Sequence, residues 1–404
     1  MKIFIVPSRL CAGGAERVGI VLANGFAQKG HEVYLLSNTN LDIVYPISSS
    51  VHVVNIFPNT TNKFKKWIGA VRQLRIEIKK HRPDVILGIE ETCSLIAKIA
   101  SRGQQTHVIC TEHNSYQRPP SAPMGRMEWF MKYQMTKLYE CVTVLTEADR
   151  DYIGSRLDNV VVMPNPLAIQ PVENIPDKKK VLLAAGRLDV WHTKGFDLLI
   201  KAWGLIKGEN AAGQREKCKS DDVACKMKDE GWRLQIAGTG SEESLRYLKQ
   251  LCKENGVEDT VDFLGFRKDI EDLYRQSEIF VLSSRYEGFG LVLIEAMSQG
   301  CACVACDYKG RQREIMSPTP ALPRREESLS PCPSPVERGD VEVCENGILC
   351  EPDNVEALAE GIKRMMEDEE YRKEVQRNSV ERSNAYSVDR IVQRWENLFE
   401  QMIY

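Results

Sequence analysis

The alternation of apolar and polar positions predicts a chain of short buried strands separated by amphipathic helices. Apolar runs bounded by turn residues indicate strands over residues 2–7, 31–37, 84–89, 107–111, 141–145 and 160–163. Apolar residues at helical spacing predict helices over residues 15–28, 64–81, 92–101 and 126–139. Because strands that alternate with helices run in one direction, this part of the chain is expected to form a parallel, doubly wound sheet.

A second series of the same kind follows a segment interrupted by prolines, which indicates a second domain. Strands are expected over residues 181–185, 233–237, 261–264, 279–282, 301–305 and 347–350. A chain of 404 residues also exceeds what one hydrophobic core usually serves. We therefore predict an α/β protein with two Rossmann-like domains, residues 1–166 and 167–386, and a ligand cleft between the carboxyl ends of their sheets. A last helix within residues 387–404 is expected to pack back towards the first domain.

Two segments interrupt the second series and are expected to be inserted loops. Residues 208–231 are rich in glycine and charge with little periodicity, and residues 317–340 carry six prolines among Ser, Arg and Glu. Such segments bury too few apolar side chains to form a core element.

Composition narrows the classes of function. The net charge of −3, from 54 basic and 57 acidic residues, argues against a general nucleic-acid-binding protein. No apolar run approaches the ~20 residues that span a bilayer. The thirteen cysteines are scattered through apolar runs, unlike a disulfide framework, and the first residues read as a strand rather than a signal peptide. We therefore expect a cytoplasmic protein whose membrane contact would be peripheral, on the inner face of the cytoplasmic membrane.

Two clusters contain possible metal ligands, and neither is predicted to bind a metal. Cys301, Cys303 and Cys306 alternate as on a strand and have no nearby His to complete a set of four ligands, so a buried strand is expected there. Asp149 opens a short helix three residues after Thr146, a spacing typical of a helix cap. We expect no metal and no cofactor.

The most informative stretch is residues 279–300, which predict a buried strand, a glycine-rich turn and a buried helix. Glu295 is the only charged residue between positions 288 and 306. A carboxylate inside an apolar helix costs several kcal/mol unless hydrogen-bond donors meet it, so Glu295 is a candidate site residue. Glu287 lies on the preceding turn, and the helix N-terminus between the two can hold an anion. Two hydroxyl-binding carboxylates that flank an anion predict a nucleotide-sugar site, whereas no third glycine completes a dinucleotide fingerprint.

Cationic side chains are expected at the same edge of the second sheet. Arg187 and Lys194 lie on the loop that follows the strand at residues 181–185. At the carboxyl end of a strand, two cations and a helix N-terminus could neutralise a departing diphosphate without a metal.

Motifs in order along the chain resemble glycosyltransferase family 4, whose members are retaining enzymes with the GT-B fold. The residues that carry the resemblance are Gly13-Gly14-Ala15-Glu16-Arg17, Glu112-His113-Asn114, Gly186-Arg187-Leu188, Lys194-Gly195, Gly238-Thr239-Gly240, Phe263-Leu264-Gly265 and Glu287-x7-Glu295. The resemblance covers nearly the whole chain apart from the two insertions. It is closest to members that extend lipid-linked oligosaccharides or surface polysaccharides with hexose or N-acetylhexosamine units.

The resemblance implies a role for each matching residue. Arg187 and Lys194 would bind the pyrophosphate of the sugar donor, Glu295 the ribose hydroxyls and Glu287 the donor sugar. The remaining implied donor-binding residues are Gly14, Gly238, Phe266, Arg267, Gly288, Phe289, Gly290 and Leu291. Gly14 would close onto the phosphates through its backbone, and the loop at 265–267 would border the base. A UDP-sugar is expected rather than a GDP-sugar.

The acceptor side is implied to lie in the first domain. Gly13, Glu16, His113 and Asn114 match the residues there, with His113 near the reacting sugar. The implied mechanism is front-face attack with retention, in which the leaving phosphate can take the acceptor proton, so no dedicated base is assigned. The alternatives are a sugar-nucleotide epimerase or hydrolase of the same fold and a non-catalytic nucleotide-sugar binder.

One predicted helix is strongly basic. Residues 63–82 hold eight Lys or Arg and one acid, Glu77, beside an apolar stripe of Trp67, Ile68, Val71, Leu74 and Ile78. The basic side chains are either an ordinary solvated face or a surface for anionic lipid and a lipid-linked pyrophosphate.

Overall fold

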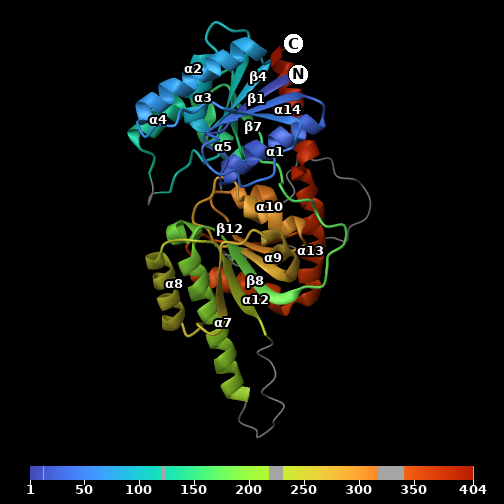
Figure 1. Cartoon of the computed structure of the whole chain (residues 1–404). Helices are drawn as coiled ribbons and strands as arrows, with labels where there is room; N and C mark the ends of the chain where they lie inside the picture. The colour runs from blue at the N-terminus through green and yellow to red at the C-terminus, as the bar shows by residue number, and fades with distance from the viewer. Residues whose placement is uncertain (12, 120–122, 218–230, 317–340, 404) are drawn as a thin grey trace. The chain divides into compact units, whose positions relative to one another are not determined.

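The computed structural model describes residues 1–11, 13–119, 123–217, 231–316 and 341–403. These residues form two compact units, each built on one sheet with helices on both faces (Figure 1). Unit 1 comprises residues 1–168 and 386–404, and unit 2 comprises residues 169–385. The prediction of two doubly wound α/β domains is confirmed.

The sheet of unit 1 is parallel throughout and has the order β3-β2-β1-β4-β5-β6-β7. Its strands are β1 (Lys2–Val6), β2 (Glu32–Ser37), β3 (Val51–Asn55), β4 (Val85–Ile89), β5 (His107–Thr111), β6 (Cys141–Val144) and β7 (Val160–Val162). The sequence did not predict β3. It is an edge strand in which only Val51 is buried, so it lacks the continuous apolar run of an inner strand.

Helices cover both faces of this sheet. They are α1 (Gly14–Gln28), α2 (Lys63–His81), α3 (Glu90–Ala100), α4 (Arg126–Tyr133), α5 (Glu147–Ile153) and α14 (Val388–Ile403), with short 3₁₀ turns at Met135–Leu138 and Gly154–Arg156. The prediction of one helix over residues 126–139 is wrong, because α4 ends at Tyr133. The hydroxyl of Thr136 donates to the carbonyl of Lys132, and this side-chain bond competes with the backbone pattern that would continue the helix.

The last helix packs onto the first within unit 1. The aromatic rings of Phe26 on α1 and Phe399 on α14 lie 5.6 Å apart between centroids. His31 Nε2 lies 2.7 Å from Glu396 Oε1. The two helices approach so closely at Gly25 that a Cβ there would lie 2.6 Å from Val388 Cγ1. The chain therefore returns to unit 1 after completing unit 2.

The sheet of unit 2 has the order β10-β9-β8-β11-β12-β14-β13. Its strands are β8 (Lys179–Ala185), β9 (Arg233–Ala237), β10 (Val261–Gly265), β11 (Ser277–Leu282), β12 (Ala302–Cys306), β13 (Val341–Cys344) and β14 (Gly347–Cys350). All neighbours are parallel except β13, which pairs antiparallel with β14. The sequence did not predict β13, a partly exposed edge strand of four residues.

The helices of unit 2 also lie on both faces of its sheet. They are α6 (Trp191–Lys194), α7 (Phe196–Lys217), α8 (Glu242–Glu254), α9 (Ile270–Gln276), α10 (Leu291–Ser298), α11 (Arg311–Met316), α12 (Val355–Glu367) and α13 (Glu369–Ser383), with 3₁₀ turns at Leu188–Val190 and Asn384–Tyr386. α7 runs ten residues into the first predicted insertion. The rest of that insertion, 218–230, and the second at 317–340 lie outside the described residues. No helix in the described part of the chain is long and apolar enough to cross a membrane.

Several local predictions are confirmed. Thr146 caps α5 by accepting a hydrogen bond from the backbone N–H of Asp149 at 3.2 Å, and the Asp149 carboxylate accepts bonds from Ser115 and Tyr116. Cys303 and Cys306 lie in the fully buried strand β12, directly after the buried Cys301. Both clusters therefore have the structural roles expected of them.

The contact between α1 and α14 generates the first prediction. Gly25→Ala should lower the thermal midpoint by about 3–6 °C, because overpacking costs about 1–3 kcal/mol and here exceeds the gain in helix propensity. Gly208→Ala in α7 is the matched control, since a Cβ there meets nothing within 4 Å. Differential scanning calorimetry of the two variants is the measurement. A midpoint for Gly25→Ala at or above that of Gly208→Ala would contradict the packing of α14 onto α1.

Candidate functional site

Loops at one edge of the second sheet carry most of the candidate site residues. The strands β8, β9, β10 and β11 are neighbours or near neighbours and run parallel, so their carboxyl ends lie at the same edge. The loops that follow them hold Arg187, Gly238, Phe266 and Glu287 in that order. The structure therefore brings these residues to one side of unit 2.

Lys194 and Glu287 are in direct contact. Lys194 Nζ lies 2.6 Å from Glu287 Oε1, and the Ser284 hydroxyl donates to the same oxygen at 2.7 Å. Both charged side chains are largely buried, with 22% and 11% of their surfaces exposed. Gly195 follows Lys194 with φ +65°, and a Cβ there would lie 1.9 Å from the carbonyl oxygen of Ser283. The loop after β8 and the loop after β11 therefore approach each other as closely as backbones allow.

Arg187 lies on the exposed start of the loop that leads to Lys194. Its side chain is exposed and has no ion pair among the described residues. The neighbouring Gly186 meets Gly238, where a Cβ would lie 1.8 Å from the Gly186 carbonyl oxygen. The glycine at 238 is therefore required by the close passage of two strand-end loops.

The turn before α10 and the buried carboxylate have the form that the sequence predicted. Gly290 precedes α10 with φ +92°, a left-handed conformation that favours glycine, and Leu291 is the first helical residue. Phe289 is buried, and Glu295 is 2% exposed. The hydroxyl of Tyr274 donates to Glu295 Oε2 at 3.3 Å. The sequence prediction that Glu295 lies inside an apolar helix is confirmed.

The loop after β10 presents a mixed surface. Phe266 is 55% exposed. Arg267 is paired with Asp269 through a bond of 2.8 Å from its Nε. An exposed aromatic ring beside a guanidinium can stack against a planar base.

The acceptor-side candidates lie at the equivalent edge of unit 1. Gly13 and Gly14 follow β1, whereas His113 and Asn114 follow β5, and β4 pairs with both strands in parallel. Glu16 is 8% exposed and accepts a bond of 2.7 Å from Arg9 Nε. Its carboxylate folds over Gly13, where a Cβ would lie 2.0 Å from Glu16 Oε2. The structure thus collects this second set of candidates within unit 1.

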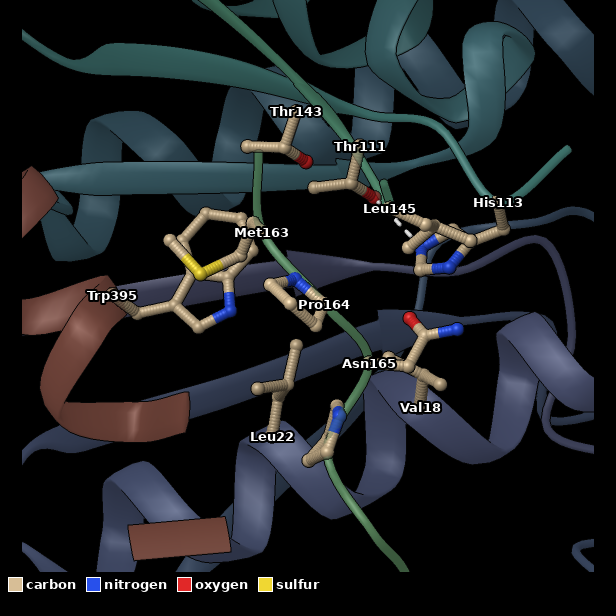
Figure 2. A pocket seen from close by; sticks show the side chains of 11 residues that line it. Val18, Leu22, Thr111, His113, Thr143, Leu145, Met163, Pro164, Asn165 and Trp395 are labelled. Atoms are coloured by element: carbon tan, nitrogen blue, oxygen red, sulfur yellow. Dashed lines mark hydrogen bonds between the residues drawn. The ribbon is translucent and has the colours of Figure 1, made fainter. Parts of the chain in front are cut away.

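His113 borders a small cavity in unit 1 (Figure 2). Its Nε2 lies 3.1 Å from the Thr111 hydroxyl, and its Nδ1 is buried with no hydrogen-bond partner among the described residues. Burial lowers the pKa of His113 to about 4 because the charged imidazolium is desolvated. The imidazole is therefore neutral at neutral pH. Trp395 of α14 lines the same cavity.

A buried ion network beside His113 was not foreseen from the sequence. Lys132 on α4 is fully buried, pairs with Glu112 and lies 3.1 Å from Glu91 Oε1. Its ammonium also lies 4.6 Å from the centroid of the Tyr116 ring. Burial raises the pKa of Glu112 to about 8, and the attraction of Lys132 opposes that rise. The network anchors α4 to the end of β5.

Roles for Arg285 and Ser284 were not predicted either, because serine, glycine and polar residues in the segment 283–290 indicate only a turn. Ser284 contacts Glu287, as described above. Arg285 forms a two-pronged ion pair with Asp197, eighty-eight positions earlier. The available signal was a basic residue, Arg285, in a turn of serines and glycines that also holds the acidic Glu287.

Comparison with known proteins finds a glycosyltransferase family model in each unit. A family model described as Glycosyltransferase Family 4 matches residues 12–170, and one described as Glycosyl transferases group 1 matches residues 179–368. Together the two models match most of the chain.

Individual relatives match over their full lengths. An uncharacterized glycosyltransferase of Haemophilus influenzae is 26% identical over 398 residues, 98% of each chain. A Campylobacter jejuni enzyme, named as an α-1,4-N-acetyl-D-galactosaminyltransferase that acts on a GalNAc-GalNAc-diNAcBac-PP-undecaprenol, is 23% identical over 100% of this chain and 99% of its own.

Among solved structures, Anabaena Alr3699/HepE in complex with UDP is similar at a TM-score of 0.68 and 18% identity, covering 99% of this chain and 100% of the other. This likeness extends through both units and supports the GT-B fold. With the two family models, it leads to one conclusion: the chain belongs to glycosyltransferase family 4 and has the GT-B fold.

Proposed function

We propose that this glycosyltransferase moves a hexose or N-acetylhexosamine from a nucleotide-diphosphate sugar to a saccharide acceptor, with retention of configuration and without a metal. The observation that carries the proposal is the group of charged residues at the strand ends of unit 2. There, Lys194 and Glu287 are in contact, and Arg187 and the buried Glu295 lie on neighbouring segments. This combination offers cations for a diphosphate and carboxylates for sugar hydroxyls.

The sugar donor is proposed to bind through unit 2. Arg187 and Lys194 hold the diphosphate, and the first backbone N–H groups of α10 supplement them. Glu295 accepts hydrogen bonds from the ribose hydroxyls, and Glu287 accepts them from the donor sugar. Phe266 and Arg267 border the base. A UDP-sugar is favoured, with support from the UDP complex of the structurally similar Anabaena protein.

The reaction is proposed to follow a front-face course. The acceptor hydroxyl oxygen bonds to the anomeric carbon as the bond from that carbon to the β-phosphate oxygen breaks. The electron pair of the broken bond remains on the phosphate oxygen, which takes the acceptor proton. Lys194 and Arg187 stabilise the charge that develops on the diphosphate, a contribution commonly worth about 3–4 kcal/mol for one well-placed group. His113, neutral at neutral pH, orients the acceptor by hydrogen bonding.

The acceptor is proposed to be a lipid-linked oligosaccharide or a surface polysaccharide, and unit 1 is proposed to contact the membrane that carries it. The named activity of the Campylobacter relative supports this acceptor class. On α2, Lys65, Arg72 and Lys79 are exposed at helical spacing together with Ile76. Arg75 is different, because its Nη1 donates to the carbonyls of Ala100 and Arg102 and so caps α3. The proposed surface therefore excludes Arg75.

A group of exposed apolar side chains on α4 also supports a membrane contact of unit 1. Met127, Trp129 and Phe130 on α4 and the nearby Leu138 expose between 46% and 74% of their surfaces. Aromatic and basic side chains together are typical of proteins that lie at a lipid interface. The protein is proposed to be cytoplasmic and peripheral on the inner face of the cytoplasmic membrane.

The most direct test of the proposed function is a transfer assay in EDTA. A panel of UDP- and GDP-sugars is incubated with undecaprenyl-diphosphate-linked saccharides, and the product is identified by mass spectrometry and NMR. We expect transfer to proceed in EDTA, because leaving-group stabilisation by Arg187 and Lys194 needs no metal ion. We expect an α-linked UDP-sugar to give an α-linked product, because front-face attack retains the configuration. An inverted product, or activity lost in EDTA and restored by Mg²⁺, would contradict the mechanism. If the sugar nucleotide is turned over at a rate that no acceptor increases, the protein is the epimerase or hydrolase of the alternative. If the sugar nucleotide binds without turnover, the protein is a non-catalytic nucleotide-sugar binder.

The roles of the two cations generate a further prediction. Arg187→Ala and Lys194→Ala should each lower kcat by about a hundredfold or more, because each stabilises charge that develops in the transition state. The control is Lys249→Ala, which removes an exposed charge on α8 of the same unit. Steady-state kinetics with saturating sugar donor measures the effect. A kcat for either site variant within threefold of that of the control would remove that residue from the reaction.

The basic face of α2 generates the membrane prediction. Lys65→Gln, Arg72→Gln and Lys79→Gln combined should weaken binding to phosphatidylglycerol vesicles about a hundredfold at low salt, because each basic residue near an anionic surface contributes about 1 kcal/mol. The matched control neutralises Arg246, Lys249 and Lys253 on α8, which are also exposed and carry the same charge. Vesicle sedimentation at low and high salt measures the difference. If both triple variants sediment equally, α2 is only a solvated face.

A further inference from the structure

Arg285 is a largely buried guanidinium for which the proposed reaction has no role. It lies three residues after the end of β11, between Ser284 and the proposed sugar-binding Glu287, and only 13% of its side chain is exposed. An arginine that binds phosphate directly needs free N–H groups. The contacts of Arg285 show that its N–H groups are engaged within unit 2.

The guanidinium of Arg285 joins three segments of unit 2. Its Nη1 and Nη2 donate to the two carboxylate oxygens of Asp197 at 2.7 and 2.8 Å. Its Nη1 also donates to the carbonyl of His192 at 2.6 Å, and its Nε donates to Asp353. Asp197 lies in the first turn of α7, three residues after Lys194, which is the last residue of α6. Arg285 thus holds both ends of the segment 192–197.

The turn that follows β11 binds the backbone around Lys194 through the carbonyl groups of three consecutive residues. The carbonyl of His192 accepts from the Arg285 side chain, and that of Thr193 accepts from the Arg285 backbone N–H at 2.9 Å. The carbonyl of Lys194 accepts from the Ser283 hydroxyl at 2.9 Å. A helix as short as α6 leaves most of its carbonyls without internal partners. The carbonyl of His192 also accepts from the backbone N–H of Gly195 at 3.2 Å. Together the bonds fix where the Lys194 side chain begins.

A purely structural role would be the ordinary interpretation of such a buried ion pair. A buried pair, however, contributes little net stability compared with apolar residues of the same volume, because both charges lose their hydration. Its distinctive property is geometry, since the planar guanidinium fixes the orientation of both partners and a lysine cannot do so. Groups that bind developing charge must be held within about 0.5 Å of the productive position.

We propose that Arg285 is a positioning residue, which holds the segment 192–197 so that the Lys194 ammonium meets the diphosphate of the sugar donor. Arg285 itself does not touch the substrate. The proposal rests on the proposed role of Lys194. It predicts that Arg285 affects binding of the diphosphate and leaves binding of the nucleoside unchanged.

The test compares affinities for UDP and uridine by calorimetry in the wild type and in Arg285→Lys. Arg285→Lys keeps the positive charge but loses the planar guanidinium that makes the two-pronged ion pair. We expect UDP affinity to fall about tenfold, with kcat falling by at least as much. Uridine affinity should stay within about twofold, which also shows that the domain is folded. Arg233→Lys is the control, because Arg233 also forms a two-pronged pair, through its Nε and Nη2 with Asp262, and lies at the opposite end of β9 from the site. We expect that variant to bind UDP like the wild type.

A double-mutant cycle with Lys194→Ala separates the two proposals. If Lys194→Ala leaves UDP affinity unchanged, the proposed role of Lys194 fails. If Lys194→Ala weakens UDP binding but Arg285→Lys does not, the positioning role is overturned. In the Lys194→Ala background, Arg285→Lys should cost less than about twofold in UDP affinity, and additive losses would also overturn the proposal. Should Arg285→Lys fail to fold, Asp197→Asn keeps the shape of the partner, and the same selective loss of UDP affinity is expected; equal losses for UDP and uridine would overturn the positioning role.

Discussion

The parallel pairing of β8 with β11 is the constraint on which the site in unit 2 depends. Register places Leu182 opposite Ile279 and Leu183 opposite Phe280, all four in the buried core. Because both strands run in the same direction, the loops that follow them leave the sheet at the same edge. Lys194 and Glu287 are ninety-three positions apart in the chain, yet their charged groups lie in contact at this edge. A shift of register would separate them.

The contact between Lys194 and Glu287 gives the site an internal counter-ion. A buried ammonium without a partner would be strongly destabilising, and Glu287 satisfies it in the absence of substrate. In the proposed function, the diphosphate takes over the ammonium and Glu287 is released to accept bonds from the donor sugar. Binding would then give the ammonium a new counter-ion, while hydroxyl groups of the sugar and of Ser284 replace the ammonium at the Glu287 carboxylate. Ser283 and Arg285 bind the backbone carbonyls of Lys194 and His192. The backbone there can therefore stay in place while the partners of the two charged side chains change.

The sequence predicted those parts of the fold that rest on local patterns. Inner strands such as β5 and β12 were located because continuous apolar runs reflect burial on both faces. The buried position of Glu295 was clear because all its neighbours are apolar. The edge strands β3 and β13 were missed because partly exposed strands lose that pattern. The ion pairs of Arg285 and Lys132 were missed because their partners are distant in sequence, and the local sequence does not show which residue a charged side chain will pair with.

A structure of the protein with UDP bound tests the central claim most directly. The account predicts that the β-phosphate lies within hydrogen-bond distance of Lys194 Nζ and of the Arg187 guanidinium. It also predicts that the ribose hydroxyls contact Glu295 and that the backbone at residues 192–194 stays fixed by Ser283 and Arg285. A diphosphate that lies away from Lys194, with the Lys194 and Glu287 pair intact, would contradict the account.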